Sequence, residues 1–110
     1  MKTQFWVYML ECSDHRFYVG FTSDLENRIH EHQSGKYKGF TSKRLPVKLV
    51  WFQEYQDPNE AIRAEKQIKD WSREKKIALI KNDLERVKFL AMRNTPYTNG
   101  KYIISRVTSK

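Results

Sequence analysis

Residues 6–20 read Trp-Val-Tyr-Met-Leu-Glu-Cys-Ser-Asp-His-Arg-Phe-Tyr-Val-Gly. Two runs rich in aromatic and β-branched residues flank a polar stretch of turn formers, which is the usual signal for a β-hairpin. A three-residue loop at 13–15 places Tyr8 opposite Gly20. Side chains alternate faces along a strand, so Tyr8 and Tyr18 are expected on the same side of the hairpin, as diagonal neighbours roughly 7–8 Å apart.

Two phenols beside a glycine would form a polar-tipped pocket on a small sheet. The plain alternative is that both tyrosines simply pack in the hairpin with their hydroxyls at the surface. Two charged residues further along favour a functional site. Arg28 follows Gly20 by eight residues on a predicted helix, and Glu65 lies on a later predicted helix.

With these residues the chain resembles the GIY-YIG nuclease family, specifically its small single-domain members related to the nuclease module of the bacterial excision-repair endonuclease UvrC. Residues 7–8 stand at the end of the family's first tripeptide, and residues 18–20 match the second with Val for Ile. Trp6 replaces the glycine of the first tripeptide. Arg28 and Glu65 fall at the spacing and in the helix contexts of the family's catalytic arginine and metal-binding glutamate.

The resemblance covers about residues 4–81 and implies an α/β fold. The expected structure is a small, mainly antiparallel three-stranded sheet flanked by helices, in the order β-β-α-β-α-α. Residues 1–82 would form this nuclease-like domain. Residues 83–110 would be a basic extension that continues the last helix and then becomes a tail.

The resemblance also implies a metal-dependent endonuclease that hydrolyses phosphodiester bonds in DNA, with DNA repair or recombination as its setting. Glu65 would hold one Mg²⁺ or Mn²⁺ ion, which retains much of its hydration shell. Arg28 would bind a non-bridging phosphate oxygen. Tyr8 or Tyr18 would orient the attacking water, and the preference is for Tyr8. His32 matches a position where small members carry a histidine, so it would contact phosphate, relay a proton or serve a structural role.

Two other functions stay open at this point. The chain could be a nucleic-acid-binding module that keeps the fold with little or no cleavage, or a protein-interaction adaptor. A carboxylate in a phosphate-binding cleft repels phosphate unless a metal intervenes, which favours the nuclease. For Glu65 itself, the structural alternative is an ion pair with Lys69 at i+4.

The first helix is predicted from Ser23, as a cap with Glu26 closing a capping box, to about Gln33. Gly35 is expected to end that segment. The nearly continuous apolar run of residues 45–55 predicts a third strand that is covered on both faces for part of its length and lies at the centre of the sheet.

A second helix is predicted to begin with Asp57 as the cap and Pro58 at the first helical position. Its buried stripe is expected at Ala61, Ile62 and Ile68, with Glu65 on the same stripe. Ser72 is expected to cap a further helix.

Charge favours a polyanionic partner, because 21 Lys and Arg against 13 Asp and Glu give a formal net charge of +8 and a pI near 9.7. The expected partner is nucleic acid, with DNA preferred, and the alternative is a merely solvated basic face. A flexible loop at 35–44 would contact phosphates while Tyr37 or Phe40 stacks on a base. The predicted nucleic-acid-binding residues are Lys36, Lys38, Lys43, Arg44, Lys69, Arg73, Lys75 and Lys76.

The single Cys12 excludes an internal disulfide. No apolar run resembles a signal peptide or reaches the roughly 20 residues of a membrane span, so a cytoplasmic protein without a membrane partner is expected. The oligomeric state is left open between a monomer and a weak dimer.

Overall fold

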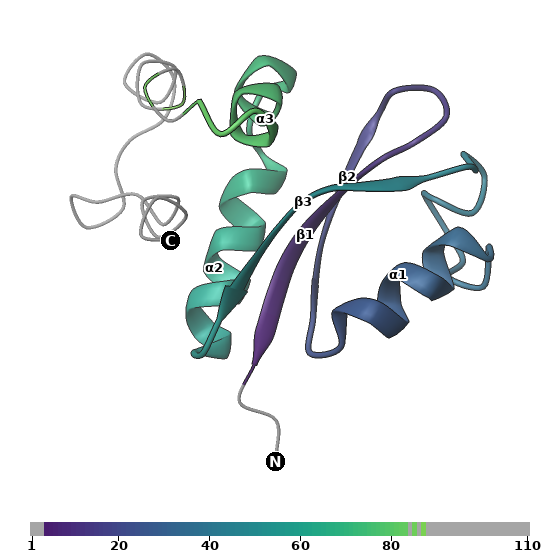
Figure 1. Cartoon of the computed structure of the whole chain (residues 1–110), viewed down its shortest axis with the longest axis horizontal. Coiled ribbons are helices and arrows are strands. Elements are labelled where there is room, and N and C mark those ends of the chain that lie inside the picture. Colours follow the sequence, from purple (N-terminus) through teal and green to yellow (C-terminus); the bar gives the residue numbers. More distant parts are fainter. Residues whose placement is uncertain (1–3, 84, 86, 88–110) are drawn as a thin grey trace. The chain divides into compact units, whose positions relative to one another are not determined.

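The computed structural model describes residues 4–83, 85 and 87. Its elements follow the predicted β-β-α-β-α-α order and form an α/β fold (Figure 1). They are β1 (Phe5–Glu11), β2 (Phe17–Thr22), α1 (Leu25–Gln33), β3 (Lys48–Tyr55), α2 (Pro58–Lys69) and α3 (Arg73–Ile80). Within the described residues, no helix is both long enough and apolar enough to span a membrane.

The chain divides into two compact units, one ending at Lys69 and the other beginning at Asp70. The first unit contains the sheet with α1 and α2, and the second contains α3. The predicted boundary after residue 82 stays a prediction, because most of the proposed extension at 83–110 lies outside the described residues.

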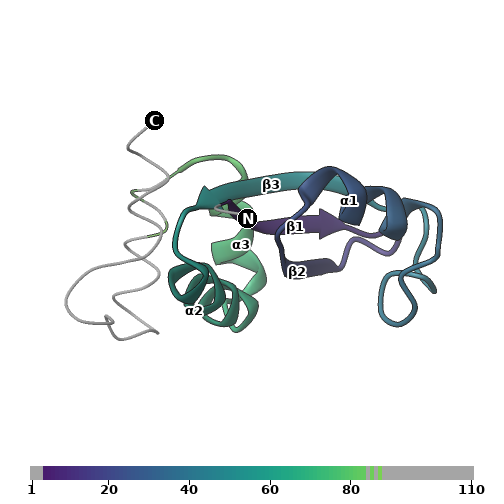
Figure 2. The same ribbon diagram turned by 90° about the horizontal axis from the view of Figure 1, so that it is seen from below.

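The sheet has three antiparallel strands in the order β2-β1-β3, so β1 lies between its two partners (Figure 2). The antiparallel sheet is confirmed, but the prediction that the third strand is central is wrong. Residues 7–10 of β1 are fully buried, whereas Phe52 of β3 is 44% exposed. The apolar run was misleading because an edge strand can carry large side chains on a face that stays partly open to solvent.

The β1–β2 hairpin has the predicted register. Tyr8 pairs with Gly20 and Leu10 pairs with Tyr18. The three-residue loop is closed by the hydrogen bond from the Cys12 amide to the Arg16 carbonyl at 2.8 Å. The two tyrosines therefore lie on one face of the hairpin, as the alternation of side chains requires.

The N-cap of helix α1 lies one residue later than predicted. Asp24, not Ser23, is the N-cap, and its side chain accepts a hydrogen bond from the Asn27 amide at 3.3 Å. The hydroxyl of Thr22 accepts from the Asp24 amide at 3.0 Å and so helps to place the cap. The helix ends as predicted, with Gly35 at φ 81°, a conformation that glycine adopts without steric cost.

Helix α2 starts as predicted, because Asp57 accepts a hydrogen bond from the Asn59 amide at 2.9 Å and Pro58 is the first helical residue. It packs against all three strands. Its buried side is formed by Ala61, Ala64 and Ile68. The prediction for Ile62 is wrong, since this side chain is 36% exposed.

Helix α1 is tied to the tyrosine-bearing face of the hairpin by a small hydrophobic cluster. Tyr8 and Leu10 form its buried centre, and Leu25 and Ile29 of α1 pack against it. This packing holds the remaining side chains of α1 over the hairpin, where the polar groups of the site meet.

In the second unit, Ser72 caps α3 as predicted by accepting a hydrogen bond from the Lys75 amide at 3.2 Å. Asn82 follows the helix at φ 60°, and the Asn82 and Asp83 amides bond to the Leu79 and Ala78 carbonyls. This is a Schellman-type ending, so the backbone accounts for an asparagine at position 82.

Candidate active site

Tyr8 reaches across the hairpin and lies directly over Gly20. A Cβ atom at position 20 would overlap the hydroxyl and Cζ of Tyr8 and lie 2.9 Å from its Cε2. Only a glycine therefore leaves room for the ring in this position. The rings of Tyr8 and Tyr18 are 6.2 Å apart between centroids, which confirms that they are neighbours on one face.

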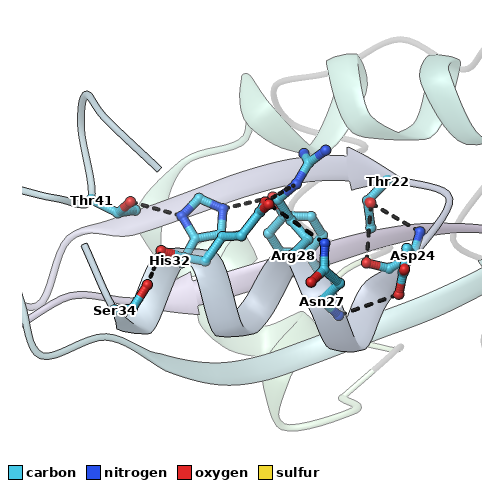
Figure 3. Close-up of polar contacts among 9 residues, drawn as sticks. Thr22, Asp24, Asn27, Arg28, His32, Ser34 and Thr41 are labelled. Carbon is cyan, nitrogen blue, oxygen red and sulfur yellow. Dashed lines mark hydrogen bonds and ion pairs between the residues drawn. The ribbon is translucent and has the colours of Figure 1, made fainter. Parts of the chain in front are cut away.

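His32 is the polar centre of this region (Figure 3). Its Nε2 lies 2.9 Å from the Tyr8 hydroxyl, and its Nδ1 lies 2.7 Å from the Thr41 hydroxyl. Tyr8 and His32 have no exposed surface, and Thr41 is 1% exposed. Both ring nitrogens are thus satisfied by buried hydroxyl groups, which is what a buried imidazole requires.

Aromatic rings surround the imidazole. Its centroid is 5.0 Å from that of Tyr18 and 4.2 Å from that of Tyr37. Tyr37 comes from the segment after α1, as does Phe40, which stacks against Tyr18 at 6.2 Å. The segment at residues 35–44, which was predicted to be a flexible loop, therefore packs against His32 and Tyr18.

Arg28 lies one helical turn before His32, at the edge of the same cluster. Its Nε is 3.2 Å from a carboxylate oxygen of Glu31, and its guanidinium lies 4.9 Å from the centre of the Tyr37 ring. The Arg28 side chain is 29% exposed. This arrangement fixes the inner part of the guanidinium and leaves the cation accessible from solvent.

Burial dominates the electrostatics of the site. It raises the pKa of Tyr8 to about 12, and hydrogen-bonding interactions with Arg28 and Tyr18 oppose that rise. Burial also raises the pKa of Tyr18. Desolvation, together with the Arg28 cation, lowers the pKa of His32 to about 4, against the opposing effect of Glu31. At neutral pH both phenols are protonated, the imidazole is neutral, and Arg28 supplies positive charge.

Arg44 has a structural role in this structure that the prediction of a phosphate contact did not include. Its Nε lies 3.1 Å from Asp14, its Nη1 donates to the Phe40 carbonyl at 2.8 Å, and the guanidinium lies 3.9 Å above the Phe40 ring. Arg44 thus joins the segment after α1 to the hairpin turn. Because it covers a face of Phe40, it also limits the stacking of a base there.

The remaining predicted phosphate contacts divide by exposure. Lys36, Lys38 and Lys43 are exposed, as are Lys69 and Arg73. Lys76 is half-buried, and burial lowers its pKa.

The burial of Lys75 contradicts the prediction that this side chain contacts phosphate. It is 1% exposed, its ammonium lies 4.2 Å above the Trp71 ring, and burial lowers its pKa to about 8. Helical periodicity, which turns this residue inward, decides its placement more strongly than its charge does.

Glu65 lies on α2 with a side chain that is 17% exposed. Its carboxylate is 2.9 Å from the Lys69 ammonium, so the ion pair considered as the structural alternative is present. Within the described part of the chain, the polar contacts of Glu65 lead to Lys69 and not to Arg28, His32 or a tyrosine. The structure therefore brings together Tyr8, Tyr18, Arg28 and His32 by direct contacts, and Glu65 stands apart from those contacts.

The donor chemistry of Glu65 suits a hard divalent cation. Within the described residues, no group of three or more His, Cys, Asp or Glu side chains converges as in a preformed metal cage. A single, largely buried carboxylate fits Mg²⁺ or Mn²⁺ bound through one protein ligand, with water and phosphate oxygens completing the octahedron. A cation bound to Oε2, the carboxylate oxygen that Lys69 contacts, would displace the ammonium.

Two residues of the site were missed from the sequence. Thr41 bonds to His32, and Glu31 holds Arg28. Tyr37, which was predicted to stack on a base, packs on both His32 and Arg28. The i+3 spacing from Arg28 could have indicated Glu31. Thr41 gave no comparable signal, because it reaches the imidazole through the path of an irregular segment.

Comparisons with known proteins identify the family of this chain. The family model described as the GIY-YIG catalytic domain matches residues 4–78. The UPF0213 protein YsiG of Lactococcus lactis is 43% identical over 88 residues, which cover 79% of this chain and 85% of the relative. A UPF0213 protein of Syntrophus aciditrophicus is 45% identical over 83 residues, covering 74% and 95%. The solution structure of a UPF0213 protein of Bacillus halodurans is 40% identical, with a TM-score of 0.48 and coverage of 71% and 83%.

Proposed function

The chain belongs to the GIY-YIG family, a family of nuclease type, and on that premise we propose that it is a metal-dependent endonuclease that hydrolyses phosphodiester bonds in DNA. One observation carries the proposal. The buried hydrogen bond between Tyr8 and His32 lies beside Tyr18 and Arg28, so two side chains of the hairpin and two of α1, all suited to phosphate chemistry, meet in one cluster.

Arg28 would bind a non-bridging oxygen of the scissile phosphate. An arginine has five N–H donors, and the contact with Glu31 uses the Nε side of the guanidinium. The Arg28 side chain is 29% exposed, so donors remain for a phosphate, and an oriented cation of this kind stabilises the charge that develops in the transition state.

Tyr18, and not Tyr8, is the phenol that fits contact with the attacking water. Tyr8 has no exposed surface, whereas Tyr18 is partly buried. This reverses the preference drawn from the sequence, because spacing cannot distinguish a covered phenol from an open one. Burial raises the pKa of Tyr18, so in the free protein it orients water as a protonated phenol.

Glu65 would hold the divalent cation once Lys69 moves away. When bound, Mg²⁺ or Mn²⁺ supplies polarisation of the phosphate and neutralisation of the leaving oxygen. A site with one carboxylate ligand binds a cation weakly, so metal and DNA are expected to bind together. Because the chain resembles the nuclease module of UvrC, the proposal also includes a role in DNA repair or recombination and a cytoplasmic location.

A nucleic-acid-binding module with little cleavage is the second candidate, and the Glu65–Lys69 pair favours it. This ion pair neutralises the carboxylate that would otherwise repel phosphate. If the Glu65–Lys69 ion pair persists in the complex with DNA, the protein could bind DNA without a divalent cation.

The two candidates are separated by incubating labelled single-stranded, duplex and branched DNA with wild type and Glu65→Gln, with Mg²⁺, with Mn²⁺ and with a chelator. Glu26→Gln is the matched control, because it removes one carboxylate from an exposed site on α1. We expect cation-dependent cleavage by wild type and Glu26→Gln and a loss of at least about 100-fold in Glu65→Gln. Equal cleavage by all three proteins would remove the metal assignment, and binding by wild type without cleavage under every condition would support the second candidate.

A further inference from the structure

Thr41 is a buried hydroxyl residue that the proposed function does not use. It lies in the irregular segment between α1 and β3, is 1% exposed, and places its Oγ1 2.7 Å from Nδ1 of His32 (Figure 3). The opposite nitrogen of the same ring contacts the Tyr8 hydroxyl at 2.9 Å. A neutral imidazole has one N–H donor and one acceptor, so its two hydroxyl neighbours must play different parts.

The acidity of the two hydroxyl groups indicates which part each plays. A phenol, with an ordinary pKa of about 10, donates a hydrogen bond more readily than the aliphatic hydroxyl of a threonine. The nearby Arg28 cation further favours donation by the Tyr8 hydroxyl, so Tyr8 is the better donor to Nε2 of His32. The imidazole proton then belongs on Nδ1 and is donated to Thr41.

We propose that Thr41 is a positioning residue that holds the proton of His32 on Nδ1, so that Nε2 accepts a hydrogen bond from Tyr8. The bond made by one ring nitrogen decides the state of the other, and a buried N–H without an acceptor is costly. A valine side chain at position 41 would leave Nδ1–H without this acceptor, and the proton would be better placed on Nε2.

The hairpin turn holds Thr41 against the imidazole. The Arg44 amide donates to the Thr41 carbonyl at 2.9 Å, and the Ser13 amide donates to the Arg44 carbonyl at 2.9 Å. The ion pair between Arg44 and Asp14 ties the same two segments through side chains. The position of the hydroxyl is therefore set by the fold and does not depend on a chance rotamer of an exposed loop.

The inference deepens the proposed function and rests on it for its catalytic consequence. Hydrogen bonds would run in one direction, from Tyr8 to His32 and from His32 to Thr41. They would fix the Tyr8 ring, whose centroid lies 6.2 Å from that of Tyr18, and so help to place the phenol that contacts the attacking water. Reversing the imidazole tautomer would reverse the hydrogen bond to Tyr8 and loosen this arrangement.

The direct test is the tautomer of His32, measured by ¹⁵N–¹³C correlation NMR on ¹⁵N-histidine-labelled wild type, Thr41→Val and Thr41→Ser at neutral pH. Wild type and Thr41→Ser should show a protonated Nδ1 and an unprotonated Nε2. Thr41→Val keeps the shape and loses the hydroxyl, so it should shift the proton to Nε2. A proton on Nε2 in wild type would overturn the proposal, as would an unchanged tautomer in Thr41→Val.

Cleavage gives a second readout. Thr41→Val should lower kcat for DNA cleavage about tenfold, because the buried Nδ1–H of His32 loses the acceptor that orients it. Thr41→Ser should stay within a fewfold of wild type, and an equal loss in both would contradict the role of the hydroxyl. The NMR measurement needs no activity, so an inactive wild type would count against the proposed function while the tautomer still tests Thr41.

Discussion

At His32, burial and neighbouring charge together decide the protonation state. The imidazole has no exposed surface, and the Arg28 cation lowers its pKa while the Glu31 carboxylate opposes that effect. Both ring nitrogens contact hydroxyl groups, which a neutral imidazole can satisfy. The residue is therefore part of a neutral hydrogen-bond network, and this distinguishes it from a histidine poised to titrate near pH 6.5.

The stability of the protein should depend on pH through this residue. The pKa of His32 is about 4 in the folded state against 6.5 unfolded. Between these values the unfolded chain binds the proton and the folded chain does not, so the free energy of unfolding falls as pH decreases from 6.5 to 4. The difference corresponds to about 3 kcal/mol.

The measurement is urea unfolding at pH 7 and pH 4 for wild type, His32→Gln and His30→Gln. His32→Gln should lose about 3 kcal/mol less than wild type over this range, because it lacks the titrating group. His30 is exposed on the same helix, and its substitution should leave the wild-type dependence unchanged. Parallel pH dependences for wild type and His32→Gln would contradict this assignment.

Residue-level predictions succeeded where local periodicity sets the neighbour. The placement of Tyr8 over Gly20 followed from strand alternation and loop length. The contact between His32 and Thr41 could not be predicted, because Thr41 lies in an irregular segment and neither residue type implies such a contact. Lys75 shows the opposite failure, since its charge suggested a surface position that the helix does not provide.

Among the elements, α1 carries the site residues and depends on its first turn. Asp24 caps the helix through the Asn27 amide and is itself placed by Thr22. Leu25 and Ile29 then fix the rotation of the helix over the hairpin. The orientation of Arg28 and His32 follows from these few contacts.

Loss of this cap should destabilise the protein measurably. Asp24→Ala should lower the free energy of unfolding by about 1 kcal/mol, because the Asn27 amide loses its acceptor. Asp24→Asn retains an acceptor oxygen and should stay close to wild type. Chemical denaturation of the three proteins checks this, and equal stability of Asp24→Ala and wild type would mean that the cap is placed elsewhere.

The sequence predicted whether each of the six elements is a helix or a strand, but it did not predict the order of the strands in the sheet. The third strand illustrates the difference. An apolar run indicates burial but does not say which strand has neighbours on both sides, and the order β2-β1-β3 depends on pairing between distant segments. The predicted cap at Ser23 failed by one residue because Asp24 competes for the same turn.

For the molecule as a whole, a formal charge of +8 sets the expected response to salt. Affinity for DNA should fall as salt rises, because binding releases counterions from the phosphates. The exposed lysines of the segment after α1 are the best candidates for these contacts, as they border the aromatic cluster.

A triple substitution tests this surface. Lys36→Gln, Lys38→Gln and Lys43→Gln together should weaken DNA binding and reduce the slope of log K against log salt by up to about 2.7 on duplex DNA. The matched control replaces Lys48, Lys66 and Lys81, which are also exposed, with glutamine. Equal effects in the two triple variants would show that net charge, and not this segment, determines binding.

If the cluster around Arg28 performs phosphodiester hydrolysis, DNA cleavage should depend on the guanidinium, and the variant to measure is Arg28→Gln. Arg63→Gln serves as the control, since it removes one exposed positive charge from α2. In the presence of Mg²⁺, we expect kcat/KM for DNA cleavage to fall about 100–1000-fold in Arg28→Gln and to stay near wild type in Arg63→Gln. Cleavage by Arg28→Gln at the rate of Arg63→Gln would show that this cluster is not the catalytic site.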